Sequence, residues 1–191
     1  MAKPPGVLFV CTGNLCRSPM AEQLLRAGLR ARFGEGPDLV GISSAGTQAV
    51  AGRAMWPPAQ AELTRRGLPP DRFTTRPLRR DSVLGSDLVL TATRTHRDDV
   101  VTLAPEALGR VFTWREIASL LHGVGVDDVP GVTPAERLRA LPALAAGRRG
   151  VVASPPSESL DVADPMGGGA EDFRRAAAET AEAIRVLVDL L

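Results

Sequence analysis

The stretch VLFVCTGNLCRSPMAE, Val7 to Glu22, changes its pattern twice. Its first residues, Val7 to Val10, form a short apolar run between Gly6 and a polar turn, which is typical of a buried strand. Beyond the turn, Ser18 stands in the N-cap position and Pro19 at the first helical residue, where its missing N–H is harmless. Apolar residues then recur at helical spacing: Met20, Leu24, Leu25 and Leu29. Strand, tight turn and helix form the first half of a βαβ unit.

Strands and helices alternate along the rest of the chain. Further buried strands are predicted at Leu39–Ile42, Leu88–Leu90 and Val111–Phe112. Helical patterns lie at about Pro58–Arg66, Thr95–Leu103 and Trp114–Leu121. This alternation predicts an α/β fold of three α/β/α layers, in which helices cover both faces of a central four-stranded parallel sheet. Such sheets bind ligands at the carboxyl ends of their strands, which is where the opening turn lies.

The segment from Gly123 to Ala163 is rich in Gly, Pro, Ala and Val and has little periodicity. Thr133 and Glu136 predict one short helix within it, opened by a capping box. We interpret residues 123–163 as an excursion of a single domain that spans residues 1–191. A last amphipathic helix is predicted to pack on the sheet through one face, formed by Phe173, Ala177, Ala181, Ile184, Leu187 or Val188, and Leu191.

Composition excludes several classes of function. The chain has 191 residues, with 23 Lys and Arg against 22 Asp and Glu. This balance gives no sustained positive field, so we expect neither nucleic acid nor a membrane as partner. No apolar run could span a bilayer, and the apolar stretch near the start of the sequence is too short for a signal peptide. We therefore expect a cytoplasmic protein. Both cysteines, Cys11 and Cys16, lie in the opening turn, which points to chemistry rather than to a disulfide framework.

The opening turn suits an anion, because a strand that runs through a glycine-containing turn into a helix presents converging N–H groups at the positive helix end. The chain has no lysine after Lys3, so a Walker-type nucleotide loop is not expected. Arg17 can instead bind a tetrahedral oxyanion through paired hydrogen bonds. Cys11 ends the strand and would face the phosphorus. The same groups favour its thiolate form, which makes Cys11 the candidate nucleophile.

Other polar side chains would complete a phosphoryl-transfer site. Ser18 can donate its hydroxyl to the sulfur, and Asn14 tolerates the left-handed backbone that a tight loop needs. The leaving oxygen must be protonated and the second step needs a base, and one acid can serve both. Asp164, in DVADPMGGG, is the stronger candidate, because Pro165 fixes the backbone beside it and glycines let the loop approach. Asp161 is the weaker one.

The sequence VCTGNLCRSPMAE, residues 10–22, resembles the signature of the low-molecular-weight protein tyrosine phosphatases. ADP at residues 163–165, followed by GGGAEDFRR, is similar to the acid loop and final helix of that family. SSAGT at 43–47 and SDLVLTATRTHR at 86–97 fit its second and third strands. The resemblance covers nearly the whole chain except about residues 124–160, and it implies the fold of the phosphotyrosine protein phosphatase I type.

The resemblance also implies a mechanism. Cys11 would carry a phosphocysteine intermediate, Arg17 and the loop amides would stabilise the transition state, and Asp164 would act as acid and then as base. No metal or cofactor is implied, and the substrate would be a phosphorylated protein or a small phosphomonoester. Cys16 would form a reversible disulfide with Cys11 under oxidation. The phosphate-binding residues that it implies are Thr12, Gly13, Asn14, Leu15, Cys16, Arg17 and Ser18.

The chain departs from the family where the substrate ring is held. Family members grip phosphotyrosine with aromatic residues after SAG and after the Asp-Pro, whereas this chain has Val50 and Met166 in these regions and no tyrosine. We therefore assign Val50 and Met166 to the substrate pocket, since a thioether can pack on a ring. Trp56 is interpreted as ordinary packing.

Histidines contribute little to the predicted site. The family often has a histidine that supports the loop asparagine, but Phe73 stands in that place here, so this support for Asn14 is predicted to be missing. His96 and His122 lie on helical patterns and are predicted to be non-catalytic.

Relatives on the same fold provide alternatives to a phosphotyrosine phosphatase. Phosphoarginine phosphatases carry a threonine where this chain has Leu15, which cannot hydrogen-bond a guanidinium, so that alternative is weakened. Thioredoxin-linked arsenate reduction needs two more cysteines after Cys16, and none exist, but transfer of arsenate to a small thiol stays open. A phosphate-binding module without catalysis would need neither Cys11 nor Asp164, so their joint presence argues against it.

Overall fold

The computed structural model describes residues 6–34, 40–68, 72–152 and 156–191. Its sheet has four parallel strands in the order β2-β1-β3-β4, which confirms the predicted α/β class. The strands are β1 (Gly6–Cys11), β2 (Gly41–Gly46), β3 (Leu88–Thr91) and β4 (Val111–Thr113). Cys11 pairs with Gly46 of β2 and Val10 with Thr91 of β3, so three strands end at the same edge of the sheet.

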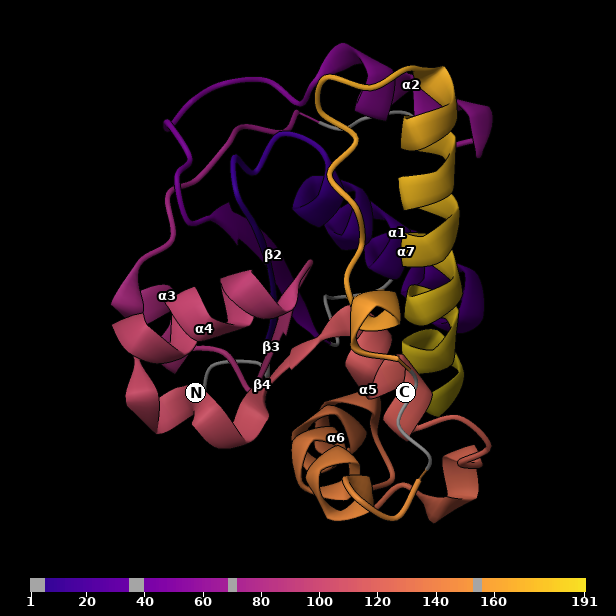
Figure 1. The fold of residues 1–191 in the computed structure, drawn as a ribbon. Coiled ribbons are helices and arrows are strands. Elements are labelled where there is room, and N and C mark those ends of the chain that lie inside the picture. The colour runs from indigo at the N-terminus through magenta and orange to yellow at the C-terminus, as the bar shows by residue number, and fades with distance from the viewer. Residues whose placement is uncertain (1–5, 35–39, 69–71, 153–155) are drawn as a thin grey trace.

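Helices cover both faces of this sheet (Figure 1). One face carries α1 (Arg17–Phe33), α5 (Trp114–Leu120), α6 (Pro134–Arg148) and α7 (Ala170–Leu190). The other carries α3 (Arg80–Leu84), α4 (Arg94–Leu103) and the 3-10 turn η1 (Pro105–Arg110). α2 (Pro57–Arg65) packs against α1 and α7. The helices predicted near residues 58–66, 95–103 and 114–121 therefore agree with α2, α4 and α5 to within one residue.

Two predicted boundaries were wrong. The second strand was predicted at 39–42 but runs from Gly41 to Gly46; Leu39 lies outside the described residues. The polar residues of this strand gave no apolar pattern from which to predict it. Ser44 can nevertheless be buried, because its hydroxyl accepts a hydrogen bond from Asn14 and donates one to Glu22. Ser18 was predicted as the N-cap of the first helix, but α1 begins at Arg17 and the Ser18 hydroxyl faces Cys11 instead of the helix amides.

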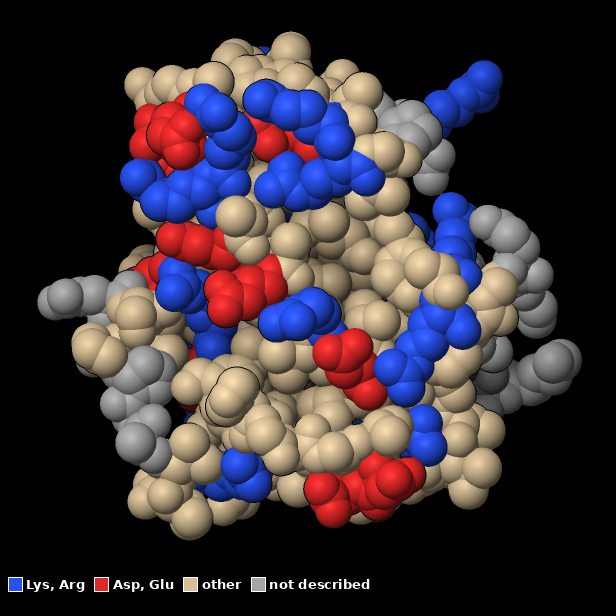
Figure 2. Space-filling view, turned by 90° about the vertical axis from the view of Figure 1, so that its right-hand side faces the viewer, with Lys and Arg blue, Asp and Glu red and all other residues tan. Residues whose placement is uncertain are grey.

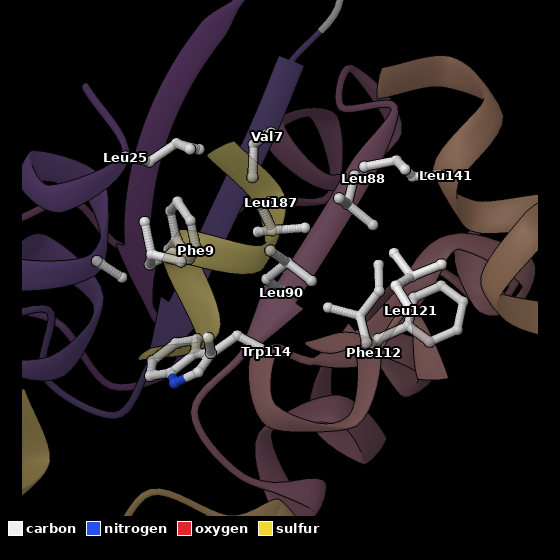
Figure 3. Close-up of a cluster of buried hydrophobic side chains, with 14 of the residues drawn as sticks. Val7, Phe9, Leu25, Leu88, Leu90, Phe112, Trp114, Leu121, Leu141 and Leu187 are labelled. Atoms are coloured by element: carbon white, nitrogen blue, oxygen red, sulfur yellow. The ribbon is translucent and has the colours of Figure 1, made fainter. Parts of the chain in front are cut away.

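The core follows from the alternation of strand side chains. Val7 and Phe9 of β1, with Leu90 of β3, point into the larger cluster, where the Phe9 and Trp114 rings meet edge to face at 6.0 Å (Figure 3). Leu8 of β1 points to the opposite face, against α3 and α4. Because both faces are covered, strand β1 is anchored along its length and its last residue, Cys11, is held in a fixed place.

The excursion before the acid loop contains more regular structure than predicted. The capping box of Thr133 and Glu136 is present, but the helix that it opens, α6, has 15 residues. Its residues Leu138, Leu141 and Ala145 are buried in the same cluster as the strands. Short 3-10 turns, η2 (Val126–Asp128) and η3 (Ser157–Leu160), flank it. This segment therefore completes the cover of one face of the sheet.

The last helix buries a wider stripe than predicted. Phe173, Ala177, Ile184, Leu187 and Leu191 are buried as expected. Ala181 and Val188 are only half-buried. The buried stripe also includes Ala176, Thr180, Ala183 and Leu190. The difference arises because α7 packs between α1, α2 and α5 and so contacts neighbours over a broad arc.

Charges of both signs adjoin one another on the surface that α7 contributes to (Figure 2). On α7 itself, Arg174 pairs with Glu171 and Arg175 with Asp172, each at 2.7 Å. This face therefore presents no field of a single sign. None of the helices in the described ranges is long and apolar enough to cross a membrane.

Candidate active site

The phosphate loop, residues 11–17, joins the end of β1 to the start of α1. Carbonyl oxygens on its outer side accept hydrogen bonds, with Thr47 N–H bound to Cys11 and Trp56 N–H bound to Leu15, both at 2.9 Å. By contrast, the amides from Gly13 to Arg17 find no acceptor within the described parts of the chain. Unpaired amides at the positive end of a 17-residue helix form a binding site for an anion.

Asn14 holds the loop in shape. It has a φ of 54°, the one positive value outside glycine among the described residues, as its predicted left-handed role requires. Its side chain is fully buried and donates to Ser18 Oγ and Ser44 Oγ, both at 2.9 Å, while the Arg76 amide donates to its Oδ1 at 2.8 Å. The support that Phe73 cannot give to Asn14 is therefore supplied by Ser44 and the Arg76 backbone.

This support continues into an ion cluster around the buried Glu22 carboxylate. The Ser44 hydroxyl donates to Glu22 Oε2 at 2.6 Å, and the Arg76 guanidinium donates to the same oxygen at 2.7 Å. Glu22 is only 4% exposed, so its charge needs such partners. Gly46 allows the close contact of β2 with the loop, since a Cβ there would lie 2.5 Å from the Thr12 carbonyl oxygen. None of these supporting side chains was predicted.

Cys11 lies at the base of the loop, with 3% of its surface exposed. Its Sγ lies 3.0 Å from Ser18 Oγ. The Ser18 hydroxyl accepts a hydrogen bond from Asn14 and lies 3.3 Å from the Ala45 carbonyl oxygen, to which it can donate. A thiolate at Cys11 is the nearer and charged acceptor, so the same proton can be donated to the sulfur. The predicted contact of Ser18 with the sulfur is present.

Arg17 brings the acid loop to the phosphate loop. Its Nη2 donates to Asp164 Oδ2 at 2.6 Å and its Nη1 to the Val162 carbonyl oxygen at 3.0 Å. Arg17 is 4% exposed, whereas the Asp164 side chain is 45% exposed. Asp164 thus stands at the mouth of the site and pairs with the guanidinium that is placed to bind an oxyanion.

Asp161, the alternative acid, points elsewhere. Its carboxylate accepts a 2.8 Å hydrogen bond from the Arg94 amide at the start of α4 and pairs with the Arg94 guanidinium. The Val162 amide donates to the Ala92 carbonyl oxygen, just beyond β3. These bonds anchor the acid loop at the edge of the sheet and leave Asp164 as the carboxylate at the pocket.

A cavity of about 190 Å³ lies above Cys11. The residues that line it are Cys11, Thr12, Gly13, Leu15, Cys16, Arg17, Asp164 and Met166. Asn14 and Ser18, also predicted to bind phosphate, are buried beneath the loop and shape it from below. Val50 is 64% exposed and is not among the lining residues, so its assignment to the substrate pocket has no support here. Trp56 lies outside the cavity as well and binds the loop only through its backbone.

Cys16 and Met166 form one wall of the cavity. The Cys16 thiol donates to Met166 Sδ at 3.3 Å. Burial, together with the negative charges of Cys11 and Asp164, raises the pKa of Cys16 to about 12, and the positive charge of Arg17 opposes them. Cys16 is therefore a protonated thiol at neutral pH.

His96, predicted to be non-catalytic, lies against the phosphate loop. Its Nε2 is 2.9 Å from Thr12 Oγ1 and its Nδ1 is 2.8 Å from Thr93 Oγ1. Burial lowers the pKa of His96 to about 4, helped by the positive charge of Arg17, so the ring is neutral at physiological pH. His122 is exposed and lines no part of the cavity. The sequence signal for His96, a lone histidine among charged residues on a helix, was too weak to separate it from His122.

The chain is similar to known phosphatases over most of its length. A family model described as low molecular weight phosphotyrosine protein phosphatase matches residues 6–130. A protein-arginine-phosphatase of Geobacillus stearothermophilus is 34% identical over 139 residues, which cover 72% of this chain and 86% of that protein. The low molecular weight protein-tyrosine-phosphatase Wzb of Escherichia coli K12 is 34% identical over 106 residues, which cover 56% of this chain and 67% of that protein.

Solved structures agree with this. The YwlE arginine phosphatase from Geobacillus stearothermophilus superposes with a TM-score of 0.67 at 28% identity, covering 97% of this chain and 91% of that one. A low molecular weight protein tyrosine phosphatase from T. tengcongensis gives 0.69 at 27% identity, covering 98% and 99%. Since the matched span runs from β1 and the phosphate loop through β4 and α5, the chain belongs to the low molecular weight phosphotyrosine protein phosphatase family.

Proposed function

We propose that this phosphatase hydrolyses phosphotyrosine in proteins through a phosphocysteine intermediate on Cys11. One observation carries the proposal: Cys11, Arg17 and Asp164 border the same cavity of about 190 Å³, with the unpaired loop amides beneath it. Enzymatic hydrolysis of a phosphomonoester by this route needs three groups: a nucleophile, a group that binds the oxyanion and a proton donor.

In the first step the Cys11 thiolate attacks phosphorus, and the bond between phosphorus and the tyrosine oxygen breaks. Arg17 and the amides of residues 13–17 bind the nonbridging oxygens as charge shifts onto them. The substrate phosphoryl group takes the place of the Asp164 carboxylate on Arg17. Asp164, once released from Arg17 at the mouth of the site, takes up a proton from solvent and donates it to the departing oxygen.

In the second step a water molecule attacks the phosphocysteine and Asp164 takes its proton. The bond between phosphorus and Cys11 Sγ breaks, inorganic phosphate forms, and the thiolate returns. Ser18 Oγ, 3.0 Å from the sulfur, stabilises the thiolate as it leaves.

The cavity wall favours an aromatic leaving group. Leu15 and Met166 offer carbon and thioether surface that packs on a phenol ring. Their one acceptor for a guanidinium is the weak Met166 Sδ, which already accepts from the Cys16 thiol. Phosphoarginine is the second candidate substrate, because the relative of Geobacillus stearothermophilus, 34% identical over 139 residues, is a protein-arginine-phosphatase.

A second role is proposed for Cys16. After a peroxide oxidises the Cys11 thiolate to a sulfenic acid, the Cys16 sulfur would attack that sulfur and release water, which leaves a disulfide that thiols can reduce. The raised pKa of Cys16 makes its resting thiol a slow nucleophile, so we expect this disulfide to form slowly.

The test compares one peptide phosphorylated on tyrosine with the same peptide phosphorylated on arginine. We expect kcat/KM to favour phosphotyrosine, and Leu15→Thr to shift the ratio toward phosphoarginine. The variant Cys11→Ser should release no phosphate from either peptide while it still binds inorganic phosphate. If the unmodified enzyme prefers phosphoarginine, the proposed substrate is wrong. If Cys11→Ser turns over either peptide, the proposed mechanism is wrong.

A further inference from the structure

His96 links two elements that meet at the cavity. It lies on the first turn of α4 and is 6% exposed, and its two ring nitrogens contact two threonine hydroxyls. Thr93 precedes α4, beyond the end of β3, whereas Thr12 belongs to the phosphate loop. The three side chains therefore form a continuous hydrogen-bonded chain from the start of α4 to the edge of the cavity.

The protons in this chain can be assigned from the donors and acceptors around them. Thr93 Oγ1 caps α4 by accepting the backbone N–H of His96 at 3.3 Å, so its own proton can go to His96 Nδ1. The neutral ring then carries its hydrogen on Nε2, which donates to Thr12 Oγ1. Arg17 Nη2 also donates toward Thr12 Oγ1, at 3.4 Å.

This assignment occupies both lone pairs of Thr12 Oγ1 and leaves its hydroxyl proton without a protein acceptor in the described structure. Thr12 lines the cavity beside Cys11 and Arg17. An anion bound there would attract that proton, because a hydrogen bond to a charged acceptor is the strong kind.

We propose that the Thr12 hydroxyl donates to a nonbridging phosphoryl oxygen of the substrate, and that His96 is the positioning residue that fixes its orientation through the chain from Thr93. The proposal rests on the proposed phosphatase function, of which it names two further residues. Thr12 thus adds a side-chain donor to the backbone amides and Arg17, and His96 sets its direction before the substrate arrives.

The surroundings of His96 keep its ring in the state that this role needs. Arg17 faces it from the phosphate loop, Asp99 from its own helix, and Asp161 and Asp164 from the acid loop. Burial and the positive charge of Arg17 favour the neutral ring, and their effect outweighs that of the three carboxylates, which favour the charged ring. A neutral ring accepts at one nitrogen and donates at the other, as the chain requires.

Two pairs of variants test the proposal. Thr12→Val removes the hydroxyl and Thr12→Ser keeps it. His96→Ala breaks the chain, and His122→Ala is the matched control, because His122 is exposed and lies outside the site. We expect Thr12→Val and His96→Ala each to lower kcat/KM about ten- to one-hundredfold, the range for a hydrogen bond to a charged group. Thr12→Ser keeps the hydroxyl and should lose less activity than Thr12→Val, and His122→Ala should stay within about twofold of the unmodified enzyme.

A double variant separates positioning from loss of folding. If His96 acts through Thr12, then Thr12→Val with His96→Ala should be no worse than Thr12→Val alone. Inorganic phosphate should bind Thr12→Val and His96→Ala more weakly by a similar factor, as measured by calorimetry. Nitrogen NMR of His96 should show a neutral ring protonated at Nε2, with both ring signals shifting when inorganic phosphate is added.

The outcomes are distinguishable. Multiplicative losses in the double variant, or a ring protonated at Nδ1 in the presence of phosphate, would overturn the role of His96. Unchanged phosphate affinity in Thr12→Val would overturn the role of Thr12. If the unmodified enzyme binds phosphate but hydrolyses no phosphomonoester, the proposed function fails, and the phosphate-binding and NMR measurements still decide this inference.

Discussion

The phosphate loop and the substrate wall above it are built in opposite ways. In the loop, Asn14 and Arg17 are at most 4% exposed, and each makes several hydrogen bonds to different elements. In the wall, Met166 is 42% exposed and its side chain has one hydrogen-bond partner, Cys16. The comparison teaches that the residues proposed for the chemical step lie in a redundantly hydrogen-bonded frame, whereas Met166, proposed to contact the substrate, has a single hydrogen-bond partner.

The largest effect on activity is expected at Asp164, where the acid loop meets Arg17 of the phosphate loop. Asp164→Ala should slow hydrolysis of phenyl phosphate about 10²- to 10⁴-fold, because the phenolate must be protonated as it leaves. The loss with p-nitrophenyl phosphate should be much smaller, since its leaving group is more stable as an anion. Steady-state rates on the two esters check this.

Asp161→Ala is the matched control for that measurement, because Asp161 binds Arg94 rather than the cavity. Its effect should be the same on both esters. Asp164→Ala should also bind inorganic phosphate more tightly, since it removes the ion partner of Arg17. Equal losses on both esters in Asp164→Ala would mean that another group is the acid.

The next effect is on stability and depends on pH. The pKa of His96 falls from 6.5 to about 4 on folding, so the unfolded chain binds a proton between these values that the folded chain does not. The folded state should therefore lose about 3 kcal/mol as the pH falls from above 6.5 to 4. Urea unfolding across this range checks it.

In that series, His96→Gln should give a shallower fall in the free energy of unfolding, because it cannot titrate. The folded protein is thus expected to be less stable in acid. If His96→Gln leaves the pH dependence of the free energy of unfolding unchanged, that dependence arises from other groups.

A smaller effect is expected beneath the loop. Ser44→Ala leaves Asn14 without one acceptor and Glu22 without one donor in a buried site, which should lower the free energy of unfolding by about 1–3 kcal/mol and also reduce kcat. Ser43→Ala removes only a 3.5 Å contact to Val7 and should stay within about 0.5 kcal/mol. Equal effects of the two would deny that the loop depends on this network.

The smallest effect is expected in the wall. Met166→Ala should lower kcat/KM for a phosphotyrosine peptide about two- to tenfold, the range for a sulfur contact with a ring. Its affinity for inorganic phosphate should not change. Val50→Ala should match the unmodified enzyme, because Val50 lies outside the cavity. If Val50→Ala lowers kcat/KM more than Met166→Ala does, the substrate ring packs near Val50 rather than on Met166.

Sequence reasoning predicted the parts of the molecule that local pattern controls. The apolar run at Val7–Val10, the glycine turn and the helical spacing after it identify a strand, a loop and a helix without reference to the rest of the chain. Cys11 and Arg17 follow from that loop, and Asp164 from the Asp-Pro and glycines around it. The observed α2, α4 and α5 have clear amphipathic periods and were located for the same reason.

The remainder depends on contacts between distant residues. The apolar pattern predicted the second strand only as far as Ile42, and Ser44 is buried beyond it because its hydroxyl binds Asn14 and Glu22, 30 and 22 residues away. His96 contacts Thr12 across 84 residues. The helix α6 was shortened in prediction because an alanine-rich sequence with Pro142 inside it has weak periodicity, although tertiary burial of Leu138 and Leu141 stabilises it.

The most direct test of the central claim is to find where phosphate is held during turnover. A phosphotyrosine peptide is mixed with the enzyme, the reaction is stopped with acid, and the digested protein is analysed by mass spectrometry. Covalent phosphate on Cys11, and on no other residue, is the predicted result. Phosphate attached to another side chain, or continued product release with none on Cys11, would contradict it.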